Sequence, residues 1–273
     1  MFDIPPVLQT ILIGTSALGA VSGMVGCLAV VRRESLVGDA ISHAALPGIA
    51  VGFLVGGDSL PMLLGGAMVS GWLTVLAVRW LAVRTRLPFE TLLAGGLSVM
   101  FGLGLVLMKW IQKNVPGSGD AGLDRWLFGQ AAAMSQRDLW AIAVLGLISL
   151  TLIVLFWKEL KLTLFDPDYA AGIGLPVKWI ERLKSGLIVV AVVVGLQSVG
   201  VVLMSALLVA PGVAARQWTD RLGHMLCLGA VFGMAFGAMG SLASWHWSLP
   251  TGPAIVLCAI LGVVLSLPAT ARR

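Results

Sequence analysis

The sequence predicts an all-α polytopic membrane protein. Hydrophobic residues make up 58% of the 273 positions, charged residues only 11%, and the mean hydropathy is +0.98. A soluble domain carries about 25% charged residues. The chain also divides into apolar stretches close to the roughly 20 residues that a helix needs to cross the hydrocarbon core. We therefore expect a single transmembrane domain over residues 1–273, with little sequence left for a separate soluble domain.

Eight stretches are apolar and long enough to predict full transmembrane helices. They are residues 6–31, 38–56, 60–82, 90–109, 138–157, 184–199, 222–244 and 251–269. A ninth stretch, 200–215, is apolar but short and contains Pro211, which predicts a half-length or broken helix. Such a helix is tolerated at membrane depth only where it packs within protein or lines a cavity. The sequence thus predicts about eight full transmembrane helices plus one short or broken helix.

The positions of Lys and Arg predict the orientation, because cytoplasmic loops collect basic residues. If 200–215 crosses the membrane, the 18 basic residues divide unequally between the two sides. The larger set is Arg32, Arg33, Arg79, Arg84, Arg86, Lys158, Lys161, Lys178, Arg182, Lys184, Arg216, Arg221, Arg272 and Arg273, and the smaller set is Lys109, Lys113, Arg125 and Arg137. We therefore expect the N-terminus outside and the C-terminus in the cytoplasm. The net charge of +5 reflects this loop bias and does not indicate nucleic-acid binding.

An acid and a histidine lie four residues apart in the apolar segment 35–48. Positions i and i+4 share one face of a helix, so Asp39 and His43 could together grip a small cation. Ionisable groups inside a bilayer are costly and are functional candidates by default. In the alternative interpretation, Asp39 caps the N-terminus of the helix and His43 is a hydrogen-bonded packing residue.

A carboxylate with an imidazole suits Mn²⁺, Fe²⁺ or Zn²⁺. Asp39 and His43 supply too few ligands for a closed site. A homodimer with this helix at its two-fold axis would supply two copies of each residue. We expect no permanently bound cofactor. The cysteines, Cys27, Cys227 and Cys258, lie in separate apolar stretches without Cys-x-x-Cys pairing and are expected to be core residues.

The segment Lys158–Lys178 is the longest predicted cytoplasmic loop. Asp166 and Pro167 can open a short helix, with Pro at its first position. Gly172 and Gly174 can close that helix. The loop contains more apolar residues than a surface connector needs, which favours a docking helix for a cytosolic partner over a plain connector.

No nucleotide-binding or hydrolytic motif is present in the sequence. There is no Gly-x-x-x-x-Gly-Lys-Ser/Thr loop and no His-Glu-x-x-His pattern. The sequence therefore gives no indication that this chain hydrolyses ATP or catalyses a covalent reaction.

Four segments resemble the manganese/zinc/iron permeases of bacterial ABC importers, the ABC-3 family. The most specific is Ser35–Ala50, which reads Ser-Leu-Val-Gly-Asp-Ala-Ile-Ser-His-Ala-Ala-Leu-Pro-Gly-Ile-Ala. Phe165–Leu175 is similar to the family's Phe-Asp-Pro-Glu stretch, with Asp168 in place of Glu and Tyr169 in place of Phe. Gly200–Arg216 and Pro250–Leu257 resemble later segments of the family, so the resemblance covers essentially the whole chain.

The resemblance implies a permease domain over residues 1–273 in the bacterial plasma (inner) membrane, with the fold of vitamin B12 and siderophore ABC permeases. It implies import of Mn, Zn or Fe, driven by ATP hydrolysis on a separate subunit. The implied partners are two copies of a cytosolic ABC ATPase, an extracytoplasmic metal-binding protein, and a second permease copy or a paralogue, together with membrane lipid and no nucleic acid. The motif's metal contacts map to Asp39 and His43, and its ATPase-docking residues map to Phe165, Asp166, Pro167, Asp168, Tyr169, Ala170, Ala171, Gly172 and Gly174.

Two alternatives remain at this point. The chain could be a proton-coupled secondary metal transporter in which Asp39 and His43 relay protons, because intramembrane acids and histidines serve as proton relays in pumps and transporters. It could also be a purely structural membrane subunit in which the pair has no part in transport.

Overall fold

The computed structural model describes residues 5–115, 126, 129 and 134–267, apart from the side chains at positions 198, 202 and 203. These residues form eleven helices and no strand. The helices are α1 (Pro6–Val31), α2 (Leu36–Gly56), α3 (Leu60–Arg84), α4 (Phe89–Asn114), α6 (Gln136–Leu155), α7 (Trp157–Phe165), α8 (Pro167–Gly172), α9 (Val177–Val199), α10 (Val201–Trp218), α11 (Leu222–Trp247) and α12 (Thr251–Ser266). The basic residues Arg125, Arg272 and Arg273, which entered the orientation argument, lie outside the described residues.

The expected all-helical membrane architecture is confirmed. Within the described chain, α1, α2, α3, α4, α6 and α11 are long and apolar enough to cross a membrane, and α12 is apolar but has only 16 residues. The expected number of eight full spans is not established by these helices. The largest difference is at α9, which begins at Val177, about two turns before the predicted span. Its first turns carry Lys178, Glu181 and Arg182, which form helix readily but lower the hydropathy.

The short segment after α9 also differs from the expectation. α10 is a continuous helix of 18 residues that runs through Pro211, so the chain is not broken at that proline. The interruption lies instead at Gly200, whose φ of 87° separates α9 from α10. Glycine adopts this backbone conformation without the steric penalty that other residues incur.

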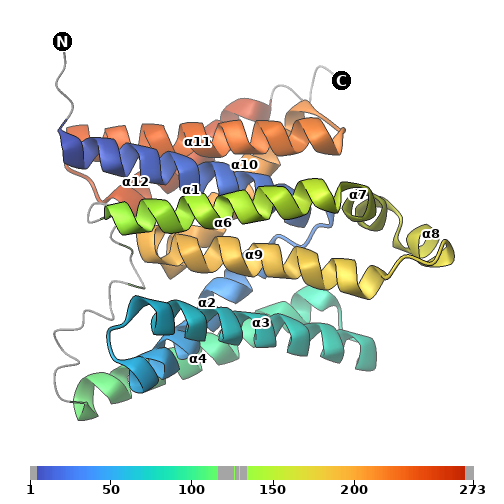
Figure 1. The fold of residues 1–273 in the computed structure, drawn as a ribbon, viewed down its shortest axis with the longest axis horizontal. Helices are drawn as coiled ribbons and strands as arrows, with labels where there is room; N and C mark the ends of the chain where they lie inside the picture. Colours follow the sequence, from blue (N-terminus) through green and yellow to red (C-terminus); the bar gives the residue numbers. More distant parts are fainter. Residues whose placement is uncertain (1–4, 116–125, 127–128, 130–133, 268–273) are drawn as a thin grey trace.

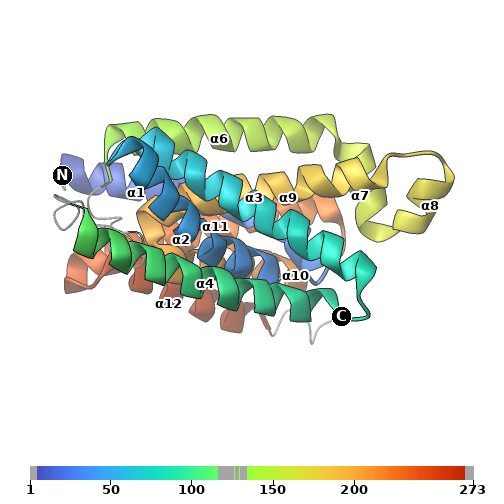
Figure 2. The ribbon, with the colours of Figure 1, turned by 90° about the horizontal axis from the view of Figure 1, so that it is seen from below.

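The long helices run along one common axis in two groups (Figure 1 and Figure 2). One group contains α2, α3 and α4, and the other contains α1, α10, α11 and α12. α9 lies between them and packs against helices of both groups, including α1, α2, α3 and α10. α1 begins at the end of the bundle opposite to the end that carries α7 and α8 (Figure 1).

Glycines set how closely the main helices pack. At the crossing of α1 and α11, a Cβ on Gly19 would collide with the backbone carbonyl of Gly233, and the reverse is also true. Gly48 of α2 and Gly66 of α3 face each other in the same way. Small residues allow such backbone contact between membrane helices, where packing rather than hydrophobic burial drives association. The second contact holds α2 in place.

We expect Gly19→Ala to destabilise the protein by about 1–3 kcal/mol, because the added methyl group forces the backbones of α1 and α11 apart. The thermal unfolding midpoint of the purified protein in detergent should fall. Gly102→Ala in α4 is the matched control, because a Cβ at Gly102 would meet no atom within 4 Å. Equal midpoints for the two variants would contradict the proposed role of the α1–α11 contact.

Candidate functional site

Asp39 and His43 lie in the first half of the α2 helix. α2 begins at Leu36 with Ser35 at its N-cap position, and Asp39 lies within its first turn. The interpretation of Asp39 as the N-cap is therefore wrong. A carboxylate in the first turn still interacts favourably with the helix dipole. At 1.5 Å per residue, His43 lies about 10 Å along the helix from Leu36.

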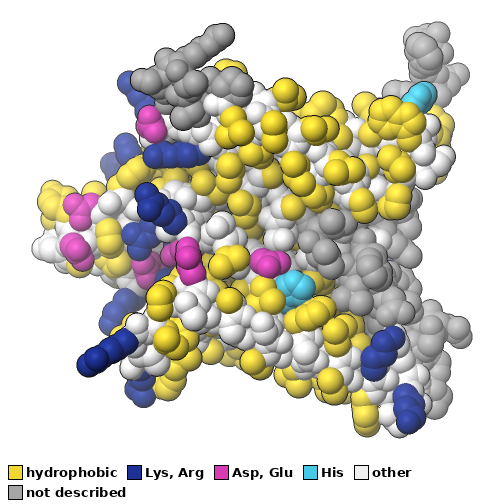
Figure 3. Space-filling view, turned by 180° about the vertical axis from the view of Figure 1, so that it is seen from behind, with side chains coloured by type: hydrophobic (Ala, Val, Ile, Leu, Met, Phe, Trp, Pro, Cys, Tyr) yellow, Lys and Arg dark blue, Asp and Glu magenta, His cyan; other side chains and the backbone are white. Residues whose placement is uncertain are grey.

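Asp39 and His43 form a close pair on one face of α2. Oδ1 of Asp39 lies 3.4 Å from Nε2 of His43, and the side chains are 32% and 14% exposed, respectively. Figure 3 shows a histidine beside an acidic side chain near the middle of one face, away from the end where most Lys and Arg side chains gather. The pair is thus reachable from outside the chain although most of α2 is buried.

Residues from two other helices surround the pair. The ring of Phe101 in α4 meets the His43 ring edge-on, with 4.6 Å between the ring centroids. The Ser205 side chain of α10 lies next to the Asp39 carboxylate and interacts with it. Nδ1 of His43 is buried and has no hydrogen-bond partner among the described residues. The structure therefore brings the segment 35–48 into contact with α10. The sequence analysis singled out both segments but did not predict that they touch.

Asp39 and His43 are together too small a set to enclose a metal ion. Within the described part of the chain, no three His, Cys, Asp or Glu side chains come together in a way that could hold a metal. Carboxylate and imidazole are suitable ligands for Mn²⁺, Fe²⁺ and Zn²⁺. One chain can therefore offer two side-chain ligands at this position, and any further ligands must come from elsewhere.

The predicted short helix at Asp166 is confirmed. Asp166 is the N-cap of α8, where its Oδ1 accepts a hydrogen bond of 2.9 Å from the backbone N–H of Tyr169. Pro167 occupies the first helical position. The helix ends at Gly172, and Gly174 follows with a φ of 85°.

Two large apolar side chains lie exposed on this segment. Phe165, at the end of α7, is 52% exposed, and Tyr169, on α8, is 58% exposed. Ala170 is buried and fixes α8 to the rest of the protein. α7 and α8 project from one end of the bundle (Figure 1 and Figure 2). The role of this segment in docking stays a prediction.

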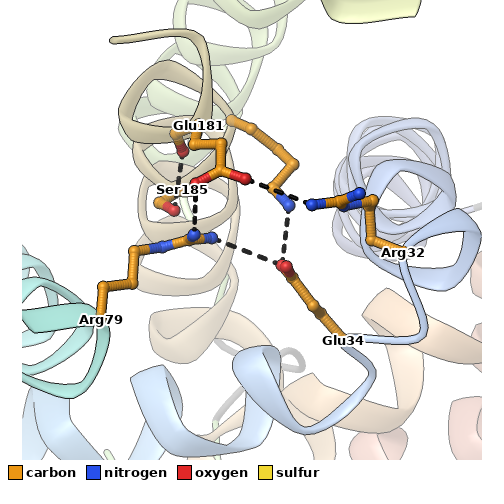
Figure 4. Close-up of polar contacts among 6 residues, drawn as sticks. Arg32, Glu34, Arg79, Glu181 and Ser185 are labelled. Carbon is orange, nitrogen blue, oxygen red and sulfur yellow. Dashed lines mark hydrogen bonds and ion pairs between the residues drawn. The ribbon is translucent and has the colours of Figure 1, made fainter. Parts of the chain in front are cut away.

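An ion-pair network joins α9 to α3 and to the connection between α1 and α2 (Figure 4). Glu181 of α9 contacts Arg32 at 3.2 Å and Arg79 of α3 at 3.0 Å. Glu34, in the α1–α2 connection, contacts Lys184 of α9 at 2.7 Å and Arg79 at 3.5 Å. The network therefore ties α9 to α3 and to the chain that leads into α2.

The sequence did not reveal this network. Glu34 precedes Asp39 by little more than one helical turn, and α9 directly follows the α8 segment. Arg32, Arg79 and Lys184 entered the sequence argument only as basic loop residues, yet the Lys184 side chain is 3% exposed. The charges at the ends of apolar segments were visible, but which acid meets which base depends on how the helices pack.

Ionisable residues on a membrane helix mark candidate pathways for ions or solutes, and this chain has no nucleotide-binding motif of its own. Comparison with known proteins gives the particular family. The model of the ABC 3 transport family matches residues 5–269, and the chain belongs to this family.

Characterised relatives and a solved structure agree with this assignment. The zinc transport system membrane protein TroC of Treponema pallidum is 45% identical over 94% of this chain and 87% of its own length. The manganese transport system membrane protein MntC of Bacillus subtilis is 39% identical over 98% of this chain, which spans 62% of that relative. The solved structure of PsaBC from Streptococcus pneumoniae in complex with Fab has a TM-score of 0.85 and 31% identity to this chain, and the match covers 97% of this chain and 94% of that one.

These similarities establish the class of the protein. It is a multi-pass inner-membrane permease subunit of an ABC transporter, and ATP hydrolysis is the task of a separate subunit. The alternative of a proton-coupled secondary transporter is therefore not supported, since an ABC permease takes its energy from its ATPase partner.

Proposed function

We propose that this chain is the permease through which a divalent transition metal, Mn, Zn or Fe, enters the cytoplasm. The observation that carries the proposal is the Asp39–His43 pair on α2, held 3.4 Å apart and open to one face of the chain. Both side chains are ligands for these metals. The names of the zinc and manganese relatives support the same class of cargo.

In this proposal, the pair forms a narrow point of the ion's path. The Asp39 carboxylate offsets part of the cost of removing water from a 2+ ion, and His43 adds a nitrogen ligand. Binding must also be weak enough for release, because conduction fails at a site that traps its ion. An incomplete set of ligands from one chain suits such a transient contact.

We further propose a dimer of permeases with α2 near its two-fold axis. A second copy, or a paralogue, would double the ligands from two to four. The partial exposure of Asp39 and His43 supports this arrangement, since a partner can reach them. The whole chain would act as one permease domain, with the fold also expected for vitamin B12 and siderophore permeases.

The proposed orientation places the end with α7 and α8 in the cytoplasm and the start of α1 outside. Most Lys and Arg side chains visible in Figure 3 gather at the end that carries α7 and α8, in line with the usual excess of basic residues in cytoplasmic loops. Each permease would bind one ATPase subunit through Phe165–Gly174, and a metal-binding protein would deliver the ion from outside. Eight full spans and one shorter crossing remain part of this proposal.

The proposal is tested by cellular Mn, Fe and Zn contents, measured by mass spectrometry at limiting metal. The strain that lacks this gene should lose one of the three metals, and the wild-type gene should restore it. An unchanged content of all three metals, in a strain without another importer for them, would overturn the proposed cargo.

Docking through α7 and α8 predicts a second result. Phe165→Ala/Tyr169→Ala should reduce the amount of ATPase that copurifies with the permease by about tenfold, because large aromatic side chains dominate many interfaces. Lys161→Ala is the control, since Lys161 is exposed on α7 but is not one of the proposed docking residues. Copurification at the wild-type level by the double variant would place the docking site elsewhere.

A further inference from the structure

The surface between α3 and α9 contains a basic pocket near the α7–α8 end of the bundle. The pocket has a volume of about 450 Å³ and is lined by residues from the end of α3, the first residue of α4 and the start of α9. Its charged lining consists of four basic residues and one acid: Arg79, Arg84, Lys178, Arg182 and Glu181. Trp80 and Phe89 provide aromatic surface beside these charges.

Three of the four cations in this pocket lack an acidic partner. Arg79 is committed to Glu34 and Glu181 in the ion-pair network. Arg84, Lys178 and Arg182, in contrast, form no ion pair with any acid that the structure describes. The Arg84 guanidinium lies over the Trp80 ring, 4.2 Å from its centroid, which fixes its position beside the pocket. Like charges that line one pocket repel one another, and a bound anion would relieve that repulsion.

A second, apolar cleft lies along the same two helices. It has a volume of about 490 Å³ and lies between α3, α6 and α9, which run side by side in Figure 1. Leu73 and Leu183 line the cleft, whereas Leu76 and Arg182, close by on the same helices, line the basic pocket. The cleft lining is almost entirely apolar. A cationic pocket and an apolar cleft thus lie next to each other along α3 and α9, and together they are called the α3–α9 groove.

We propose that the α3–α9 groove binds one diacyl phospholipid with an anionic head group. The phosphate contacts Arg84, Lys178 and Arg182, and the acyl chains lie in the apolar cleft. Basic pockets between helices at the membrane surface are suited to anionic head groups, and Trp is favoured at the level of the head groups. A free phosphate ion would satisfy the charges but would leave the cleft without an occupant.

A lipid at this position would link the start of α9, which follows α8, to the end of α3. Lys178 and Arg182 lie in the first turns of α9, immediately after α8, whereas Arg84 lies at the end of α3. A phosphate held by all three would brace the base of the α7–α8 segment against α3. The site is separate from Asp39 and His43, and it does not depend on which metal is carried.

The test is native mass spectrometry of the full-length permease in detergent, titrated with phosphatidylglycerol or with phosphatidylcholine. The wild type should retain one phosphatidylglycerol more tightly than phosphatidylcholine. Arg84→Gln/Lys178→Gln/Arg182→Gln should bind phosphatidylglycerol at least about tenfold more weakly, since each basic residue near an anionic head group adds to the attraction. Arg84→Lys/Arg182→Lys keeps the charges and should bind like the wild type.

The matched control removes three charges from loops that adjoin the same end of the bundle. Arg33→Gln/Arg86→Gln/Arg221→Gln changes exposed residues that do not line the groove. This variant should retain the lipid at the wild-type affinity. An equal loss in this control, or no loss in the groove variant, would overturn the proposal. Displacement of the lipid by millimolar inorganic phosphate would also overturn it, because the site would then recognise an anion alone.

Discussion

Asp39→Asn/His43→Ala should lower metal uptake to about a tenth of the wild-type rate or less, with the protein still present in the membrane. Removing water from a divalent ion inside the bilayer is costly, and the Asp39 carboxylate and the His43 imidazole offset part of that cost. Asn keeps the shape of Asp39 but removes its charge, and Ala removes the imidazole nitrogens of His43. Uptake is measured with the radioactive metal in cells that express equal amounts of each variant, together with the ATPase and binding protein.

The matched control makes the same chemical changes at exposed positions. Asp58 lies between α2 and α3, and His224 lies near the start of α11, and both are exposed. Asp58→Asn/His224→Ala should therefore leave uptake close to the wild-type rate. If the Asp39/His43 variant transports metal as well as this control, the pair is a structural feature of α2 and not part of the path.

Much of the scaffold was predictable from local sequence. Runs of apolar residues located the helices, and the pattern Asp166-Pro167 with Gly172 and Gly174 located α8 correctly, because caps and turns depend on neighbouring residues only. The spacing of Asp39 and His43 likewise placed both side chains on one helix face. Each of these predictions relied on short-range geometry.

The remainder depends on contacts between residues far apart in the chain. The hydropathy pattern began α9 too late, because the charged residues Lys178, Glu181 and Arg182 in its first turns lower the hydropathy and look like a loop. Phe101 and Ser205 meet the Asp39–His43 pair only because α4 and α10 pack on α2. No spacing in the sequence shows these neighbours, since nothing local encodes which helices touch.

The ion-pair network has the strongest expected effect on stability. Lys184 is almost fully buried, and its Nζ lies 2.7 Å from Oε2 of Glu34. Lys184→Met removes that partner and leaves the Glu34 carboxylate with Arg79 alone, at 3.5 Å. Breaking a buried ion pair costs about 3–5 kcal/mol, because the remaining charge stays desolvated. We expect a loss of about 3 kcal/mol, the lower end of this range, since Arg79 still compensates part of the charge.

Glu34→Gln/Lys184→Met distinguishes the charge effect from the loss of packing. The double variant no longer buries an uncompensated carboxylate, so it should recover more than half of the stability that Lys184→Met loses, as measured by unfolding in mixed micelles. The surface pair of Arg216 and Asp220, at 3.4 Å, provides the control. Arg216→Met should cost less than about 1 kcal/mol, as exposed pairs usually do.

Disrupting the same network should weaken the coupling between the α7–α8 segment and the Asp39–His43 pair. α9 follows the α7–α8 segment, and its Lys184 and Glu181 reach Glu34 and Arg79, close to the start of α2. If motion of the docked ATPase reaches Asp39 through these contacts, the double variant should still bind the ATPase and support ATP hydrolysis. Its metal uptake should fall by about tenfold, which corresponds to about 1.4 kcal/mol in the activation free energy. Full uptake by that variant would limit the network to holding the helices together.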